Sequence, residues 1–156
     1  MIGGQDGAQG SSRPKREKYR VRFTAPDARA LKVDDTEINR FVFSGLLKMT
    51  QMRVDTAANG GEGVRLAGEN AYDIIFLDHM MPGKDGIETL KEIRSAENGI
   101  NRNTPAICLT ANAISGARDK YMAAGFDNYL AKPVEPGRLE EMIRTYLPAE
   151  KVRETE

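Results

Sequence analysis

The chain has 156 residues, of which 40% are apolar, so it is long enough for one domain with a substantial core and some extra sequence. Its 23 basic and 23 acidic residues balance, so net charge gives no reason to propose binding to nucleic acid. A single cysteine excludes a disulfide within the chain, and no apolar run approaches the roughly 18 residues needed to span a membrane.

Residues 1–27 are predicted to be a flexible basic linker or the remnant of a preceding domain. Residues 1–12 are rich in Gly, Ser and Gln, a composition that cannot bury enough apolar surface to fold, and they lack the apolar core of a signal peptide. Further on, Tyr19, Val21 and Phe23 alternate with arginines, which is a weak strand signal. The competing interpretation of that stretch is a solvated linker.

Between residues 28 and 148, short apolar runs alternate five times with stretches of helical periodicity, and residues 149–156 form a charged tail. The expected strands are residues 31–33, 52–56, 72–77, 105–109 and 128–131. The expected later helices are residues 61–69, 86–94 and 115–124, the last ended by Gly125, and a final helix with Pro136 in its first turn.

The first helix is predicted from apolar residues that share one face at a spacing of three and four: Ile38, Phe41, Val42, Gly45, Leu46 and Met49. The second helix is weaker, because Gly63 and Gly68 each cost about 1 kcal/mol relative to alanine.

Alternating strands and helices predict a parallel sheet covered on both faces, with right-handed crossovers. In such doubly wound sheets, ligands bind beyond the carboxyl ends of the strands. Chemically active side chains stand at four of these ends: Asp34 and Asp35, then Asp78, Thr110 and Lys132. Three carboxylates, a hydroxyl and an ammonium at one edge indicate a site for a cation and a phosphate.

Four short motifs, in this order and on these elements, resemble the receiver domain of two-component response regulators. They are Val33-Asp34-Asp35, the run from Leu77 to Gly86, Leu109-Thr110-Ala111 and Leu130-Ala131-Lys132-Pro133. The resemblance covers about residues 29–147. It implies a (βα)5, flavodoxin-like α/β fold whose five-stranded parallel sheet has the strand order 2-1-3-4-5.

The resemblance also implies how the acids would act. Asp78 would be the phosphoacceptor, attacking a phosphohistidine of a histidine kinase or of a histidine phosphotransfer protein to form an aspartyl phosphate. Asp34, Asp35, Asp78 and the main-chain carbonyl of Met80 would hold Mg²⁺, which suits a site with few protein ligands.

Three further residues would respond to the phosphoryl group. Lys132 would pair with one of its oxygens, and Thr110 would bond another. Tyr129 would be the switch aromatic, which turns inward as Thr110 moves. The Lys132–Pro133 peptide bond is expected to be cis, which costs little before proline.

Two residues need a separate explanation. His79, the only histidine, follows Asp78, but strand alternation turns it away from its neighbour, so it is not expected to donate phosphate. Lys32 occupies a first-strand position that is usually apolar. Because a buried unpaired lysine is costly, it must reach the rim, pair with an acid, or destabilise the strand.

The expected function is therefore that of a receiver which catalyses its own phosphorylation and slow loss of phosphate. The stretch from Leu109 to Leu130 resembles receivers fused to hybrid histidine kinases, which favours an excised receiver, cytoplasmic even where the parent kinase is membrane-anchored. The alternatives are a stand-alone single-domain regulator and a phosphate-independent interaction module.

A haloacid-dehalogenase-type phosphatase is disfavoured, because Met80 stands where that family needs a second acid. Phosphorylation-dependent dimerisation is left open, and the resemblance places the partner face on the fourth helix, fifth strand and fifth helix.

Overall fold

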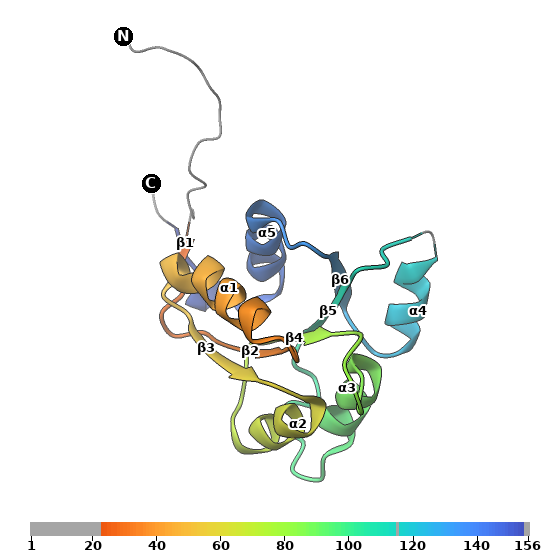
Figure 1. The fold of residues 1–156 in the computed structure, drawn as a ribbon. Helices are drawn as coiled ribbons and strands as arrows, with labels where there is room; N and C mark the ends of the chain where they lie inside the picture. The colour runs from red at the N-terminus through yellow and green to blue at the C-terminus, as the bar shows by residue number, and fades with distance from the viewer. Residues whose placement is uncertain (1–22, 115, 155–156) are drawn as a thin grey trace, which may run out of the picture.

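The central sheet of the computed structural model, which describes residues 23–114 and 116–154, contains five parallel strands. The strands are β2 (Arg29–Val33), β3 (Arg53–Ala57), β4 (Ile74–Asp78), β5 (Ala106–Thr110) and β6 (Asn128–Ala131). They lie in the order β3-β2-β4-β5-β6, each parallel to its neighbours (Figure 1). Counted from β2, this is the predicted order 2-1-3-4-5, so the predicted doubly wound α/β fold is confirmed.

Helices cover both faces of the sheet, with α1 and α5 on one face and α2, α3 and α4 on the other (Figure 1). The helices are α1 (Glu37–Leu47), α2 (Gly60–Glu69), α3 (Gly86–Ser95), α4 (Ala117–Ala123) and α5 (Pro136–Tyr146), with short 3-10 helices η1 (Lys48–Thr50) and η2 (Ala149–Lys151). In β4, Ile74 and Phe76 join the core beneath α1 and α5, whereas Ile75 and Leu77 join the core beneath α2, α3 and α4. The alternation of a buried strand thus builds both cores at once.

Local capping explains where the helices begin and end. Asn59 caps α2 by accepting the Glu62 N–H at 2.8 Å, and Asp85 opens α3 in a reciprocal capping box with Glu88. The fourth helix is shorter than the expected 115–124, and Gly125 follows it with a left-handed φ of 104°. Residue 115 lies outside the described part of the chain.

The predicted apolar face of α1 is not the face that packs on the sheet. Phe43 and Leu47, one turn apart, are buried instead, and the Phe43 ring packs edge-on against Phe76 with centroids 4.9 Å apart. Most large apolar side chains of the predicted face are exposed: Ile38 (61%), Phe41 (75%), Val42 (51%) and Met49 (68%). Because α1 carries apolar residues around most of its circumference, spacing alone could not select the buried stripe.

The chain enters and leaves the fold through two short strands. β1 (Phe23–Thr24) pairs antiparallel with β7 (Arg153–Glu154). Phe23 is fully buried in the core beneath α1 and α5. Packing therefore extends to residues on both sides of the 28–148 range expected for the domain. The strand signal at Tyr19 and Val21 lies outside the described residues.

Within residues 23–114 and 116–154, no helix combines the length and the apolar character needed to cross a lipid bilayer.

Gly63 and Gly68, two of the glycines of α2, have opposite surroundings. A Cβ atom on Gly63 would lie 2.8 Å from Cγ2 of Val33, whereas nothing lies within 4 Å of the equivalent position at Gly68. We expect Gly68→Ala to raise the free energy of unfolding by about 1 kcal/mol, because alanine is the better helix former. Gly63→Ala is expected to lower it, because the new methyl group must displace Val33. Urea unfolding of both variants beside the parent chain measures the two effects, and stabilisation by Gly63→Ala would contradict the tight contact with β2.

Candidate functional site

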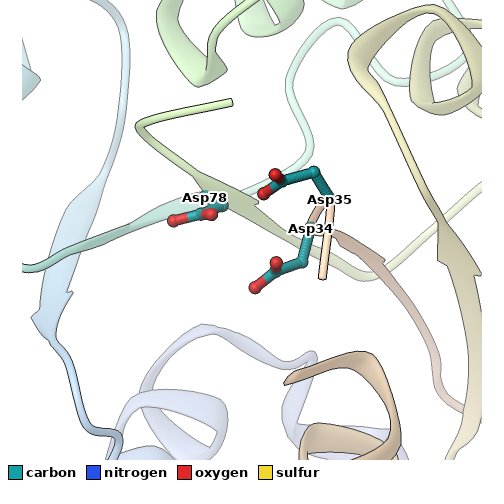
Figure 2. Close-up of side chains that lie close together, drawn as sticks. All are labelled: Asp34, Asp35 and Asp78. Atoms are coloured by element: carbon teal, nitrogen blue, oxygen red, sulfur yellow. The ribbon is translucent and has the colours of Figure 1, made fainter. Parts of the chain in front are cut away.

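Three carboxylates converge at the carboxyl ends of two neighbouring strands. Asp34 and Asp35 follow β2, and Asp78 is the last residue of β4. Figure 2 shows the three side chains close together, and one oxygen of each lies within 4.8 Å of the others. The parallel register of β2 and β4, which pairs Val33 with Leu77, brings the acids to the same edge.

Asp34 is almost fully buried and held in its ionised form. Its Oδ1 accepts the Thr36 N–H at 3.0 Å, and its Oδ2 lies 3.1 Å from the Lys32 ammonium. Burial alone would raise the pKa of Asp34, but the Thr36 bond and the Lys32 charge outweigh it, so the pKa is lowered.

Lys32 is a buried member of this site. From the sequence, it stood out only as a lysine at a first-strand position that is usually apolar. It lies two residues before Asp34 on the same face of β2, and its Nζ also lies 5.0 Å from the centre of the Phe43 ring. Burial lowers the pKa of Lys32, and the Asp34 carboxylate opposes that change. Of the three outcomes that the sequence allowed for this lysine, pairing with an acid is the one realised.

Asp78 is buried between opposing charges. Lys132, just after β6, places its Nζ 2.6 Å from Asp78 Oδ1. Burial raises the pKa of Asp78, Lys132 opposes the rise, and the charge of Asp34 adds to it. The main-chain N–H of Lys132 donates to the Thr110 carbonyl at 2.9 Å, and the Lys132–Pro133 peptide bond is cis.

Thr110 and Tyr129 lie on the opposite face of the sheet from Lys32 and Asp34. The Thr110 hydroxyl is buried, and its oxygen accepts the Asn112 N–H at 3.0 Å. The Tyr129 side chain is half-buried and packs against the core beneath α2, α3 and α4. Thr110 pairs with Ala131 and Tyr129 pairs with Cys108, so the two residues are diagonal neighbours on one face of β5 and β6.

His79 points away from the acids, toward α4. Its Nδ1 lies 2.9 Å from the hydroxyl of Tyr121, which in turn donates to Thr110 at 2.9 Å. Sequence reasoning missed Tyr121, because a tyrosine in the middle of an amphipathic helix is ordinarily a packing residue.

The loop after Asp78 folds back closely onto the end of β4. Gly86 donates its N–H to the His79 carbonyl at 2.9 Å, and a Cβ atom at Gly86 would lie 2.5 Å from the carbonyl oxygen of Asp78. Only glycine permits this approach without moving the backbone of the acid. Met80 in this loop exposes its side chain, and the role of its main-chain carbonyl stays a prediction.

The carboxylate cluster fits a small, hard cation. Asp34 and Asp78 are buried, and three acids this close repel one another. Asp35 is exposed, so one side of the cluster is open to water. Few protein oxygens, together with access for water, suit Mg²⁺ in particular.

Comparisons with known proteins agree on one family. The family model for the response regulator receiver domain matches residues 30–144. The signal transduction histidine-protein kinase BarA of Shigella flexneri is 34% identical over 116 residues, which cover 74% of this chain and 12% of that kinase. The chain thus spans about one eighth of the length of this relative.

Solved structures lead to the same group. The receiver domain of sensor histidine kinase PA1611 from Pseudomonas aeruginosa, with a magnesium ion coordinated in its active-site cleft, matches with a TM-score of 0.68 and 37% identity, covering 76% of this chain and 96% of that one. A co-crystal structure from Saccharomyces cerevisiae, of the histidine phosphotransfer protein Ypd1 with the receiver domain of Ssk1, matches with a TM-score of 0.72 and 28% identity, covering 82% of this chain and 94% of the matched one.

Proposed function

Because this chain belongs to the response regulator receiver domain family, we propose that Asp78 accepts a phosphoryl group from a phosphohistidine in a two-component phosphorelay. The observation that carries the proposal is the surroundings of Asp78. It is a buried carboxylate at a strand end, 2.6 Å from the Lys132 ammonium and grouped with Asp34 and Asp35. The proposed donor is a histidine kinase or a histidine phosphotransfer protein.

In the proposed step, one oxygen of Asp78 bonds to phosphorus as the phosphorus–nitrogen bond of the donor histidine breaks. The electron pair of that bond stays on the imidazole nitrogen, and a proton from solvent keeps the departing ring neutral. The product is an acyl phosphate on Asp78. Lys132 supports the step because its ammonium offsets negative charge on the oxygens that surround the phosphorus.

We further propose that Asp34, Asp35, Asp78 and the main-chain carbonyl of Met80 hold Mg²⁺. When bound, the ion would offset the repulsion between the carboxylates and the incoming phosphoryl oxygens. The grouping of the three acids supports this proposal, as does the magnesium ion in the cleft of the PA1611 receiver.

We propose that Thr110 and Tyr129 change position in response to the phosphoryl group. Thr110 would move to bond a phosphoryl oxygen, and Tyr129 would turn inward beside it. The similarity to the hybrid signal transduction histidine kinase G of Dictyostelium discoideum, 37% identical over 124 residues, supports a hybrid histidine kinase as the parent protein.

Intact-mass spectrometry tests the proposal directly. After incubation with acetyl phosphate and Mg²⁺, we expect a fraction of the chain to gain the mass of one phosphoryl group, and chelation of Mg²⁺ to prevent the gain. A folded chain that neither gains mass nor shows amide shifts with beryllium fluoride would instead favour a phosphate-independent interaction module.

Exposed apolar side chains around the site favour a protein as the physiological donor. Ile38 lies in the first turn of α1, Met80 two residues after Asp78, and Ile114 four residues after Thr110; all three are more than half exposed. They follow the carboxyl ends of three neighbouring strands, β2, β4 and β5, and the outward face of α1 continues the apolar surface through Val42. A pocket of about 170 Å³, lined in part by Val42, Asp34 and Lys132, connects this surface to the acids. Apolar clusters of this kind mark protein interaction sites.

We therefore expect Ile38→Ser to slow phosphoryl transfer from a phosphorylated histidine phosphotransfer domain by about tenfold, because a contact at the centre of an interface is lost. Transfer from acetyl phosphate, which needs no docking surface, should keep its rate. Ile100→Ser is the matched control, since this exposed isoleucine lies in the loop before β5, at the other edge of the sheet. Equal slowing with both donors would show that Ile38 supports the site itself rather than the docking of a partner.

A further inference from the structure

The hydroxyl of Tyr121 lies at the centre of a buried hydrogen-bonded chain that joins three elements. It lies 2.9 Å from Nδ1 of His79, which follows β4, and 2.9 Å from Oγ1 of Thr110, which ends β5. Tyr121 itself belongs to α4, and all three side chains are buried. Neither His79 nor Tyr121 has a role in the phosphoryl transfer described above.

The tyrosine ring is fixed by its neighbours. It packs edge-on against His79, with centroids 5.2 Å apart, and against Phe126, with centroids 6.2 Å apart. On its remaining side the ring of Tyr129 lies 5.9 Å away. A ring enclosed in this way cannot follow Thr110, so a movement of the Thr110 hydroxyl toward a phosphoryl group would break the bond to Tyr121.

The hydrogen bonds that the Thr110 hydroxyl oxygen accepts also favour the position that it has in this structure. The Thr110 oxygen accepts from Tyr121 and from the Asn112 N–H at 3.0 Å, which fills both of its lone pairs. Breaking the Tyr121 bond in this buried place would leave a polar group without its partner, which costs more than the same bond contributes at the surface.

We infer that Tyr121 is a positioning residue which, together with His79, holds Thr110 in its unphosphorylated position and so opposes the switch. This inference rests on the proposed function, in which Thr110 moves to the phosphoryl group. An interaction made in only one of two states shifts the equilibrium toward that state by its own free energy. Tyr121 therefore sets how strongly phosphorylation of Asp78 changes the shape of the domain.

Tyr121→Phe tests the inference, because it removes the hydroxyl and keeps the ring. Beryllium fluoride, a mimic of the phosphoryl group on Asp78, is titrated at saturating Mg²⁺ while amide NMR spectra are recorded. We expect half-saturation at about a fivefold lower concentration than in the parent chain, which corresponds to the loss of one neutral hydrogen bond. Tyr146→Phe is the matched control, because its hydroxyl donates to the Asp127 carbonyl at 3.1 Å, away from Thr110, and no change is expected.

A second comparison shows whether the effect passes through Thr110. In a Thr110→Val background, which lacks the accepting oxygen, Tyr121→Phe should leave the half-saturation unchanged. Should Tyr121→Phe fail to fold, His79→Leu decides instead. It removes both the second hydrogen-bond partner and an edge-on ring contact of the tyrosine, and it is expected to shift half-saturation in the same direction.

The outcomes separate the inference from the proposed function. A parent chain that binds beryllium fluoride, with unchanged or weaker binding by the Tyr121→Phe variant, overturns the inference alone. A folded parent chain that gives no response to beryllium fluoride or acetyl phosphate overturns the proposed function and the inference with it.

Discussion

Asp78→Asn is expected to abolish phosphorylation of the chain by acetyl phosphate and by any phosphohistidine donor. An amide oxygen is a poor nucleophile toward phosphorus, and the variant also removes one of the three negative charges that would bind Mg²⁺. The fold should survive, because burial and the charge of Asp34 raise the pKa of Asp78. At neutral pH that raised pKa means that the ionised carboxylate costs the fold stability, and asparagine has no such charge.

Two measurements on the Asp78→Asn variant separate chemistry from folding. Intact mass should show no phosphoryl gain, while the thermal midpoint should equal or exceed that of the parent chain. Asp119→Asn provides the control, because this exposed carboxylate in the first turn of α4 belongs to no part of the site, so phosphorylation should proceed as in the parent. A phosphoryl gain retained in Asp78→Asn would place the acceptor on another residue.

Lys32→Met is expected to destabilise the chain strongly in the absence of Mg²⁺. The substitution leaves the buried Asp34 carboxylate without its nearest cation, and removing one partner of a buried ion pair costs about 3–5 kcal/mol. The Thr36 N–H still donates a hydrogen bond to Asp34, so we expect a loss of stability near the lower end of this range. Mg²⁺ should restore much of this loss, because it would supply positive charge at the same carboxylates.

Thermal unfolding with and without Mg²⁺ measures this competition. The rise in melting temperature on adding Mg²⁺ should be larger for Lys32→Met than for the parent chain, since binding to the folded state alone stabilises it. Lys151→Met is the control: its partner Asp73 lies before β4, at the far edge of the sheet, and the more exposed pair should contribute about 1 kcal/mol or less and not respond to Mg²⁺. Equal rises in melting temperature for the parent chain and for Lys32→Met would show that Lys32 does not weaken the binding of Mg²⁺.

The sequence was sufficient for the sheet and for the grouping of the acids, because both follow from local rules. A strand that ends in an acid, such as β4 at Asp78, delivers it to the same edge as Asp34 once the strands are parallel. Lys32 was detectable as an anomaly, but choosing its partner required knowing which side chains share its face of the sheet.

Other features depend on tertiary packing that no local pattern encodes. The buried stripe of α1 was predicted wrongly, since the contact that selects it is between Phe43 and Phe76, which belong to different elements. Tyr121 and His79 lie 42 residues apart, and nothing in the spacing of either indicates that they meet. The need for glycine at position 63 could not be predicted either. Helix propensity gives only the cost of glycine in a helix, and it does not show that Val33 lies too close for a larger side chain.

The pairing of β1 with β7 has a consequence for how this domain joins larger proteins. The two strands lie side by side, at the edge of the fold where β2 begins, whereas the acids lie where β2 ends (Figure 1). A host protein could therefore carry the domain as an insertion between two adjoining positions, as domains with neighbouring termini permit. Such a host would be attached on the side where β1 and β7 pair, and the opposite side, which carries the acids, would stay open to a partner protein.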